Sequence, residues 1–348
     1  MKRKVALLFG GRGAEHAVSC MSGASILSAI ENELDLLPIA IDKDGSTYLY
    51  RDSRDTLKKG VLSLEHSPPV SLVRRDGVCG GLTDEGFYPI EVALPALHGD
   101  FGEDGVVQGY LATLGIPFVG TPTLGGAIAN DKAITKMLAA TVGIPTLKGC
   151  LLSPELSFAD AKAAVRSVLG VDYPYFVKPN ARGSSVGASV AKDDASLRAA
   201  LAAAAPYGEI LVEPYLASIT ELEIGYLFAN GKQLLTPIGA ISSPGGFYDY
   251  EEKYASHTAH IRSSTSLDES IACAVRRHAL ALIRLLGVRD LARIDFFLSD
   301  SGALYFNEIN PFPGFTEKSL YPILVKNLGF DYKTLLFTLI EGAYARGV

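Results

Sequence analysis

Cysteine, positive charge and long apolar runs are all scarce in this sequence, and each scarcity excludes a class of protein. The four cysteines are Cys20, Cys79, Cys150 and Cys273, without any C-x-x-C spacing. This pattern argues against a zinc site and a disulfide scaffold, and so few thiols are typical of a reducing cytoplasm. The 32 Lys and Arg residues are outnumbered by 38 Asp and Glu residues, so the formal net charge is −6. No overall positive field is available to hold nucleic acid as a partner.

The second exclusion concerns membranes. No apolar run approaches the roughly 20 residues needed to span a bilayer. The basic start Met1–Lys4 followed by Val5–Phe9 superficially resembles a signal peptide, but the apolar stretch is only five residues long and glycines follow it. A buried strand is the better interpretation. We therefore expect a soluble, cytoplasmic protein with no membrane partner.

What the sequence does contain is enough apolar material for a large core. Hydrophobic residues make up 48% of the 348 residues and charged residues 20%, close to the average of soluble globular proteins. Such a composition excludes disorder for most of the chain. At roughly 150 residues per domain, the length predicts two or three domains.

The N-terminal third has the pattern of alternating strands and helices. Buried strands are predicted at Val5–Phe9, Leu36–Ile41 and Glu91–Leu97, and a helix at Ala17–Glu31 after a glycine loop. These elements alternate like the βα units of a parallel sheet. Residues 51–90 are rich in charges and turn signals, and no element is assigned to them.

The remainder of the chain combines further strands with helices. Glycines and a proline near residue 120 precede a helix that carries Lys132 and Lys136. The other expected elements are strands at Tyr175–Lys178 and Ile210–Glu213, a helix at Ser196–Ala205, and an amphipathic helix at 271–286 that begins after Ser270 and ends at Gly287.

The glycine loop after the first strand leaves two functions open. A dinucleotide-binding fingerprint needs a third glycine, but His16 occupies that position after Gly11 and Gly13. Asp42, at a strand end suited to a ribose contact, keeps a nicotinamide cofactor as an alternative. Glycines before a helix also offer free N–H groups to a carboxylate or phosphate. Glu15 in this loop is either a solvated acid of the first helical turn or part of a site.

A second glycine-rich segment follows the strand that ends at Lys178. Its sequence, Lys178-Pro179-Asn180-Ala181-Arg182-Gly183-Ser184-Ser185-Val186-Gly187, offers consecutive small residues whose N–H groups can wrap a polyphosphate. It is not a Walker A loop, because Ala188 stands where that motif has lysine. We interpret Lys178 as a cleft lysine rather than a core residue. The alternative is a plain turn with an incidental lysine.

Two strands around a turn near residue 300 predict a hairpin with a polar face. Alternation places Arg293 and Asp295 on one face of the first strand, and Glu308 and Asn310 on one face of the second. If the strands pair across 299–302, Arg293 faces Glu308 and Asp295 lies diagonal to it. Two carboxylates and an amide oxygen are the hard ligands that Mg²⁺ or Mn²⁺ prefers. The alternative, a surface salt-bridge cluster, fits poorly among the apolar neighbours of this hairpin.

Taken together, these segments resemble the D-alanine–D-alanine ligase family of the ATP-grasp superfamily. The resemblance covers almost the whole chain and is weakest between residues 45 and 90. The matching segments are Phe9-Gly10-Gly11 with Glu15, His98-Gly99 with Gly102-Glu103-Asp104-Gly105, Asp131-Lys132, Lys178-Pro179 with Gly183–Gly187, Phe247–Tyr250 with Lys253-Tyr254, Arg293-Ile294-Asp295, and Glu308-Ile309-Asn310 with Pro313–Thr316 and Ser319.

The resemblance implies a role for each matching residue. Those expected to bind ATP are Lys132 and Lys178 at the phosphates, Glu213, Tyr215 and Leu216 at the adenine, and Glu221 at the ribose. Asp295, Glu308 and Asn310 are expected to hold two Mg²⁺ or Mn²⁺ ions. The expected catalytic set is Glu15, Ser184, Tyr254, Arg293 and the Gly314 N–H, the last two stabilising a tetrahedral intermediate. The expected substrate-binding set is His98, Lys253, Ser319 and Leu320, and residues 248–254 would form a closing loop.

The implied fold is the ATP-grasp fold, α/β and α+β. It has a Rossmann-like N-terminal domain (1–120), a central lid (121–216) and a C-terminal catalytic part (217–348). The implied reaction joins two D-alanines at the expense of ATP through an acyl phosphate, for peptidoglycan precursors, in a homodimer. Pro311 and Lys318 depart from the family pattern and put the acceptor in question. A D-serine or D-lactate acceptor is therefore the alternative within the family, and a regulator without catalysis is the alternative outside it.

Overall fold

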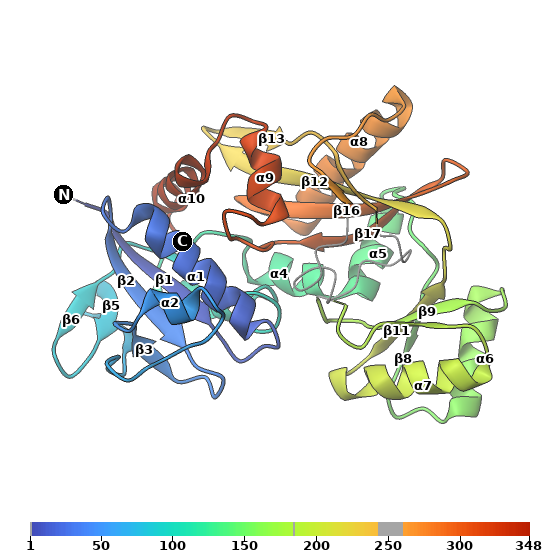
Figure 1. Cartoon of the computed structure of the whole chain (residues 1–348), viewed down its shortest axis with the longest axis horizontal. Coiled ribbons are helices and arrows are strands. Elements are labelled where there is room, and N and C mark those ends of the chain that lie inside the picture. The colour runs from blue at the N-terminus through green and yellow to red at the C-terminus, as the bar shows by residue number, and fades with distance from the viewer. Residues whose placement is uncertain (1, 184, 243–259) are drawn as a thin grey trace.

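The computed structural model describes residues 2–183, 185–242 and 260–348, which build sheets in three regions of the chain (Figure 1). The first region has a four-stranded sheet of order β3-β2-β1-β7, in which β1 pairs in parallel with β2 and β7. All but one residue of β1 are buried, as a strand covered on both faces requires. The elements are β1 (Lys4–Gly10), α1 (His16–Ile30), β2 (Asp35–Ile41), β3 (Thr47–Leu49), α2 (Arg54–Leu57), β7 (Val92–Pro95) and α3 (Val106–Leu114). The three predicted strands and the predicted helix are confirmed within a few residues.

The segment that carried no prediction forms a small antiparallel sheet beside this one. Its strands are β4 (Ser71–Arg75), β5 (Val78–Leu82) and β6 (Phe87–Pro89). Two of its residues, Leu72 and Cys79, are buried in the same core cluster as Leu37 and Ile39 of β2. The small sheet therefore extends the N-terminal core rather than forming a separate unit.

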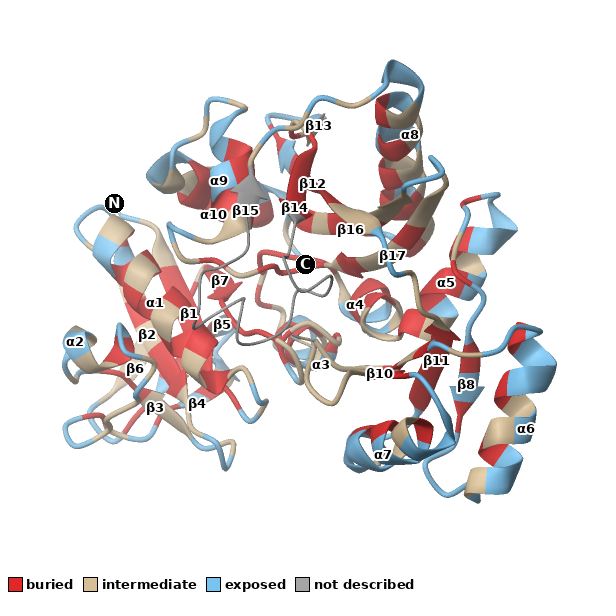
Figure 2. Ribbon diagram, turned by 45° about the vertical axis from the view of Figure 1, so that its right-hand side comes forward, coloured by how far each residue is buried: buried red, intermediate tan, exposed pale blue. Residues whose placement is uncertain are grey.

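The central region is an antiparallel sheet of order β10-β9-β11-β8. Its elements are β8 (Cys150–Leu152), α6 (Phe158–Leu169), β9 (Tyr175–Pro179), β10 (Ser189–Ala191), α7 (Asp194–Ala204), a 3-10 turn (Ala205–Tyr207) and β11 (Ile210–Pro214). The two helices each bury one side, through residues such as Val165 and Leu197, and expose the other (Figure 2). This part has its own hydrophobic core.

The C-terminal region is built on a six-stranded sheet, whose main path is β15-β14-β12-β16-β17. The elements are β12 (Ile219–Ala229), β13 (Lys232–Leu235), β14 (Gly239–Ser242), β15 (His260–Arg262), α8 (Glu269–Leu286), β16 (Leu291–Ser299), β17 (Leu304–Asn310), α9 (Leu320–Lys326) and α10 (Tyr332–Arg346). Helix α8 ends at Gly287 in the left-handed conformation, as predicted. The predicted start at Ser270 is wrong, because the helix begins after Asp268.

Two connections join these regions. Helices α4 (Thr123–Asn130) and α5 (Lys132–Thr141) contact β17, and Ala129 and Ala139 lie in the core of the C-terminal sheet. Helix α10 contacts both α1 and β7, so the N-terminal and C-terminal parts share one core. Within the described ranges, none of the helices combines the length and apolar character that crossing a membrane would need.

Candidate active site

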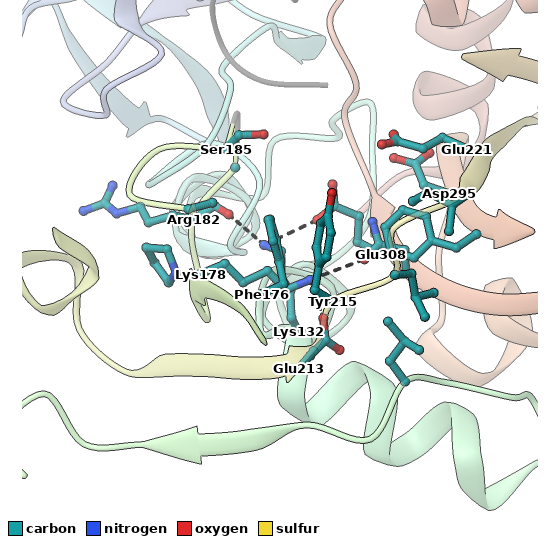
Figure 3. A pocket seen from close by; sticks show the side chains of 18 of the residues that line it. Lys132, Phe176, Lys178, Arg182, Ser185, Glu213, Tyr215, Glu221, Asp295 and Glu308 are labelled. Carbon is teal, nitrogen blue, oxygen red and sulfur yellow. Dashed lines mark hydrogen bonds and ion pairs between the residues drawn. The ribbon is translucent and has the colours of Figure 1, made fainter. Parts of the chain in front are cut away.

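A cavity opens where the central sheet faces the C-terminal sheet, with the start of α5 at one side. Its polar wall comes from α5, β9, β11, β12, β16 and β17 (Figure 3). The lining residues are Lys132, Leu147, Phe176, Lys178, Pro179, Arg182, Gly183, Ser185, Val186, Ala188, Glu213, Pro214, Tyr215, Leu216, Ile219, Glu221, Glu223, Arg293, Asp295, Phe297, Asn307 and Glu308. All six predicted ATP-binding residues and two of the three predicted metal ligands are among them.

Helix α5 delivers a lysine to the cavity from its first turn. Asp131 caps the helix by accepting a hydrogen bond from the Ile134 N–H at 2.9 Å, which satisfies one of the free donors of the first turn. Lys132 Nζ donates to the carbonyl of Arg182 at 2.7 Å and lies 3.5 Å from Glu308 Oε2 (Figure 3). Lys132 therefore links the glycine-rich loop of the central region to the C-terminal hairpin.

A buried charge cluster forms the floor of the cavity. Lys178 Nζ lies 2.8 Å from Glu213 Oε2, and Lys136 contacts the other oxygen of the same carboxylate. The side chains of all three residues are at least nine-tenths buried. The interpretation of Lys178 as a cleft lysine outside the core is therefore wrong in part, since it lines the cavity but is enclosed by its ion pair.

The two lysines determine the charge of Glu213. Burial alone would favour its neutral form, but Lys136 and Lys178 together hold the pKa of Glu213 at about 2. Burial also lowers the pKa of Lys136 to about 8, against the attraction of Glu213 and with the repulsion of Lys178. At neutral pH the carboxylate is therefore ionised between two ammonium groups.

The C-terminal hairpin pairs in a different register from the one predicted. Asp295 lies directly opposite Glu308, and Arg293 opposite Asn310, whereas we expected Arg293 to face Glu308. The register at these pairs differs from the expected one by two residues. The turn accounts for one, since the Ser299 N–H bonds to the carbonyl of Ala303, and a bulge at Asn307 between the pairs at 295 and 296 adds the other. The four predicted side chains still come together, and the two carboxylates are closer in register than expected.

Arg293 organises the acids of this hairpin. Its guanidinium donates to both oxygens of Asp295, at 2.8 and 2.7 Å, and lies 3.2 Å from Glu223 on β12. Although burial opposes its charge, Asp295 and Glu223 raise the pKa of Arg293 well above its usual value. Asn310 Nδ2 donates to Asp295 at 3.1 Å. Arg293 is therefore a fixed positive charge beside the predicted metal ligands.

The donor atoms here suit a hard divalent cation. Asp295 and Glu308 present carboxylate oxygens from adjacent strands, and Asn310 adds an amide oxygen. Among the described residues, no group of three or more His, Cys, Asp or Glu side chains is arranged to hold a metal ion. A site here would therefore depend on the amide and on oxygens from a bound phosphate.

On the N-terminal side, Glu15 faces the glycine-rich loop of the central region. Its carboxylate lies close to Gly99 and Gly183, because a Cβ at Gly99 would be 2.1 Å from Glu15 Oε2 and one at Gly183 would be 3.5 Å from either oxygen. Glu15 is the residue before α1, is partly buried, and its side chain makes no capping hydrogen bond to that helix. Ser184, its predicted partner, lies outside the described residues, as do Lys253, Tyr254 and the predicted closing loop.

His98 is buried between the N-terminal and C-terminal parts. Its Nε2 lies 2.8 Å from Ser22 Oγ and its Nδ1 3.3 Å from the carbonyl of Phe312. Glu103 lies 3.8 Å from Nδ1, and burial raises the pKa of this carboxyl group. His98 thus joins α1 to the segment that leads into Gly314.

The predicted acceptor residues lie around the start of α9. Ser319 is the residue before this helix, and its Oγ lies 3.0 Å from the Thr316 N–H. A Cβ on Gly314 would lie 3.4 Å from that Oγ, so Gly314 and Ser319 are neighbours. Leu320 is half-buried, whereas Lys318 is exposed. Pro311, the other departure from the family pattern, is buried next to Asn310.

Several residues of this region were not predicted. Glu223 could have been found by alternation, because it lies two residues after Glu221 on β12. Lys136 lies one helical turn after Lys132, yet this spacing alone does not distinguish a buried lysine from an exposed one. Asn307 carries no signal, because its place depends on the bulge.

The molecule combines a parallel N-terminal sheet, a lysine followed by a glycine-rich loop, and a C-terminal sheet that carries paired acids. This combination defines an ATP-grasp protein. The family model for the D-ala D-ala ligase N-terminus matches residues 4–121 and that for the D-ala D-ala ligase C-terminus residues 138–341. The chain belongs to the D-alanine–D-alanine ligase family.

Similar proteins support this assignment over the whole length. The chain is 37% identical to the D-alanine--D-alanine ligase of Mycobacterium tuberculosis (strain CDC 1551 / Oshkosh), covering 99% of this chain and 96% of that protein. Among solved structures, the VanG D-Ala:D-Ser ligase from Enterococcus faecalis has a TM-score of 0.85 at 30% identity, covering 99% of this chain and 100% of that one. The D-alanine-D-alanine ligase from Coxiella burnetii has a TM-score of 0.83 at 27% identity, covering 99% and 94%.

Proposed function

We propose that this protein joins two D-alanine molecules into D-alanyl-D-alanine at the expense of ATP, for peptidoglycan precursors. The observation that carries the proposal is the cavity between the central and C-terminal sheets. It brings Lys132 and Lys178 together with Asp295 and Glu308, the charges that a nucleoside triphosphate and its metal need. The membership of the D-alanine–D-alanine ligase family supplies the choice of substrates.

ATP would lie in this cavity with its phosphates toward the two lysines. Lys132 and Lys178 would bind the phosphates, Glu213, Tyr215 and Leu216 would border the adenine, and Glu221 the ribose. All six line the cavity. Lys132 also contacts the carbonyl of Arg182, so phosphate binding would be coupled to the position of the glycine-rich loop.

Asp295, Glu308 and Asn310 would hold divalent metal, with two Mg²⁺ or Mn²⁺ ions per site as the finer proposal. When bound, the metal would neutralise charge on the phosphates during transfer. The oxygen donors fit such ions. Arg293 is held against Asp295 by two hydrogen bonds and would supply a fixed positive charge at the reacting centre without being consumed.

The chemistry has two steps. The carboxylate of the first D-alanine attacks the γ-phosphorus of ATP, which gives an acyl phosphate and ADP. The amine of the second D-alanine then attacks the acyl carbon, a proton is lost from nitrogen, and phosphate leaves. Arg293 and the Gly314 N–H would stabilise the negative oxygen of the tetrahedral intermediate. Glu15, with Ser184 and Tyr254, would orient the two alanines, and His98, Lys253 and Ser319 would border them.

The acceptor is proposed to be D-alanine, with D-serine or D-lactate as the alternative. The alternative is favoured by one finding, the likeness to the VanG D-Ala:D-Ser ligase. Leu320 argues for D-alanine, since a leucine leaves a serine hydroxyl unpaired. An unpaired buried hydroxyl costs about 1–3 kcal/mol.

A competition assay tests the function and the acceptor together. Purified protein with ATP and Mg²⁺ receives D-alanine, D-serine and D-lactate at equal concentrations, and products are identified by mass spectrometry. We expect ADP, phosphate and D-alanyl-D-alanine as the main products. Dominance of a mixed product would contradict the acceptor proposal, and no ADP formation with any acceptor would contradict the ligase itself.

We also propose that the chain divides functionally at about residues 120 and 216 and acts as a homodimer. Separate sheets support the division, with α4 and α5 connecting the lid to the C-terminal part. Exposed apolar side chains on the neighbouring helices α3 and α4, namely Val106, Tyr110 and Leu124, support a subunit contact. Light scattering of wild type and of Leu124→Asp tests the dimer, which we expect the aspartate to weaken.

A further inference from the structure

One residue of the buried charge cluster has no place in the proposed chemistry. Glu213 and Lys178 line the cavity, whereas Lys136 is absent from the wall formed by the described residues. Its side chain is only 6% exposed and reaches from the second turn of α5 to Oε1 of the Glu213 carboxylate. A buried lysine without a contact to ligand needs a reason, because its desolvation is costly.

The charges of the cluster suggest that reason. One carboxylate lies between two ammonium groups, so the cluster carries a net charge of +1 when all three residues are ionised. Without Lys136, Glu213 and Lys178 would form a balanced pair with no net charge. The positive charge that the cavity offers through Lys178 therefore depends on a lysine behind the wall.

We propose that Lys136 is a positioning residue for nucleotide binding, which neutralises Glu213 so that the charge of Lys178 is available to the phosphates of ATP. The inference rests on the proposed function, since it takes ATP as the ligand of the cavity. It assigns the Glu213 carboxylate and the Lys178 ammonium group to one electrostatic unit. Burial strengthens this coupling, because charges interact more strongly away from water.

The geometry supports different roles for Lys136 and Lys178. Lys178 Nζ is 2.8 Å from Glu213 Oε2 and 3.4 Å from Asn307 Oδ1, so it lies between β11 and β17. Lys136 contacts the opposite oxygen of the carboxylate. Each lysine thus contacts one carboxylate oxygen. When Lys178 binds a phosphate, Glu213 keeps its ion pair with Lys136.

The test separates the phosphates from the rest of the nucleotide. Calorimetry at pH 7 with Mg²⁺ measures the dissociation constants of adenosine, by displacement, and of the β,γ-imido analogue of ATP. The ratio of the two dissociation constants is the contribution of the phosphates to the affinity, called the phosphate factor below. Contacts to adenine cancel in this ratio. In Lys136→Met we expect this factor to fall about tenfold or more, the scale of a hydrogen bond to a charged group.

Three further variants check the mechanism. Lys136→Arg keeps the charge and should keep the factor. Lys136→Met combined with Glu213→Gln should recover it, because the acid that captures Lys178 is gone. Glu213→Gln alone raises the cluster charge to +2 and should increase the factor. Lys162→Met, which removes a partly exposed lysine paired with Asp194 on the same lid, is the matched control and should change nothing.

Each result decides between explanations. A wild-type protein that binds neither ligand would contradict the proposed function. Wild-type binding with an unchanged phosphate factor in Lys136→Met would overturn the inference and leave the proposed function standing. A loss that Glu213→Gln fails to recover would also overturn it, since that is the behaviour of a packing residue. If Lys136→Met does not fold, the rise expected for Glu213→Gln alone still decides the matter.

Discussion

Three acids and two cations lie side by side on the C-terminal sheet and its edge, with one acid in excess. Glu223, Asp295 and Glu308 occupy paired positions on three neighbouring strands. Arg293 contacts the first two, and Lys132 contacts the third. Three acids side by side would repel one another without these cations.

For Glu308→Gln we expect a loss of at least about 100-fold in turnover, the scale seen when a charge-stabilising group is removed. The substitution keeps the shape and removes one metal-binding charge. Steady-state ADP release at saturating Mg²⁺ measures it. Glu341→Gln, which alters a surface pair with Arg3, is the control and should keep wild-type turnover. Near-normal turnover of Glu308→Gln would contradict the metal assignment.

Glu213 should make the stability depend on acid pH. Its pKa of about 2 in the folded protein lies below the ordinary 4.5, so the unfolded chain binds the proton more readily. The resulting stabilisation, on the order of 3 kcal/mol, is fully present above about pH 4.5 and is lost as pH falls toward 2. Urea unfolding between pH 6 and 3 should therefore show a steeper fall for wild type than for Glu213→Gln. Parallel curves would contradict the assignment.

Residue types were predictable from the sequence where a motif fixes them, and their contacts were not. Lys178 and Glu213 were both expected at the nucleotide, yet their direct ion pair is a contact between β9 and β11, which no local pattern encodes. Lys136 was seen only as part of a helix. Its burial depends on the central sheet packing over α5, and this is tertiary information.

Helix α5 carries the buried lysines Lys132 and Lys136, and two residues hold its first turn in place. Asp131 caps it, and Asn180 from the loop after β9 accepts hydrogen bonds from the Lys132 and Ala133 N–H groups at 3.3 and 2.9 Å. Because the lysines lie in the first two turns, loosening the helix start should displace them.

Asp131→Ala should therefore lower the free energy of unfolding by about 1 kcal/mol, the usual value of an N-cap, and should also raise the KM for ATP. Asp331→Ala is the matched control, because Asp331 caps α10 in the same way, at 2.7 Å from the Thr334 N–H. It should cost similar stability and leave the KM for ATP unchanged. Urea unfolding and steady-state kinetics measure both. Equal KM values in the two variants would show that the cap matters only for stability.

Helices and strands with a clear pattern of apolar residues were predicted well. Strands whose position depends on pairing with another strand were not. Strands β1, β2 and β7 are uninterrupted apolar runs, which identify buried parallel strands directly. The strands β4, β5 and β6 are short, with arginines in β4 and glycines in β5, and they pair with one another in a sheet of their own. The bulge at Asn307 shows the same limit, since a register is a property of two strands.

At the scale of the whole molecule, the ATP-grasp fold was predictable because the motifs occur in a fixed order along the chain. The contacts between the parts were not predictable, because they join residues far apart in sequence. Helix α10 packs on the N-terminal part, and Arg346 forms an ion pair with Asp290 and donates to the carbonyl of Phe118 at 2.9 Å. These interactions tie the C-terminal helix to the segment that ends the N-terminal part.

An ion pair joins Asp100 of the N-terminal part to Arg182 in the glycine-rich loop of the central region. Both side chains are partly exposed, and the carbonyl of Arg182 accepts the hydrogen bond from Lys132. The pair therefore connects the N-terminal part, the proposed D-alanine side, through one residue to Lys132, the proposed phosphate ligand, and breaking it should loosen both.

For Arg182→Asp, which places two acids together, we expect the KM values for ATP and for D-alanine both to rise about fivefold, the scale of about 1 kcal/mol for a partly exposed pair. The double reversal Asp100→Arg with Arg182→Asp should restore them, because it rebuilds the pair with opposite polarity. High salt should reduce the effect of the single variant, since it screens exposed charges. Reversal of the Lys162–Asp194 pair, which lies within the lid, should leave both KM values unchanged. A single reversal with wild-type KM values, or a double reversal without recovery, would mean that the lid is held by its backbone contacts alone.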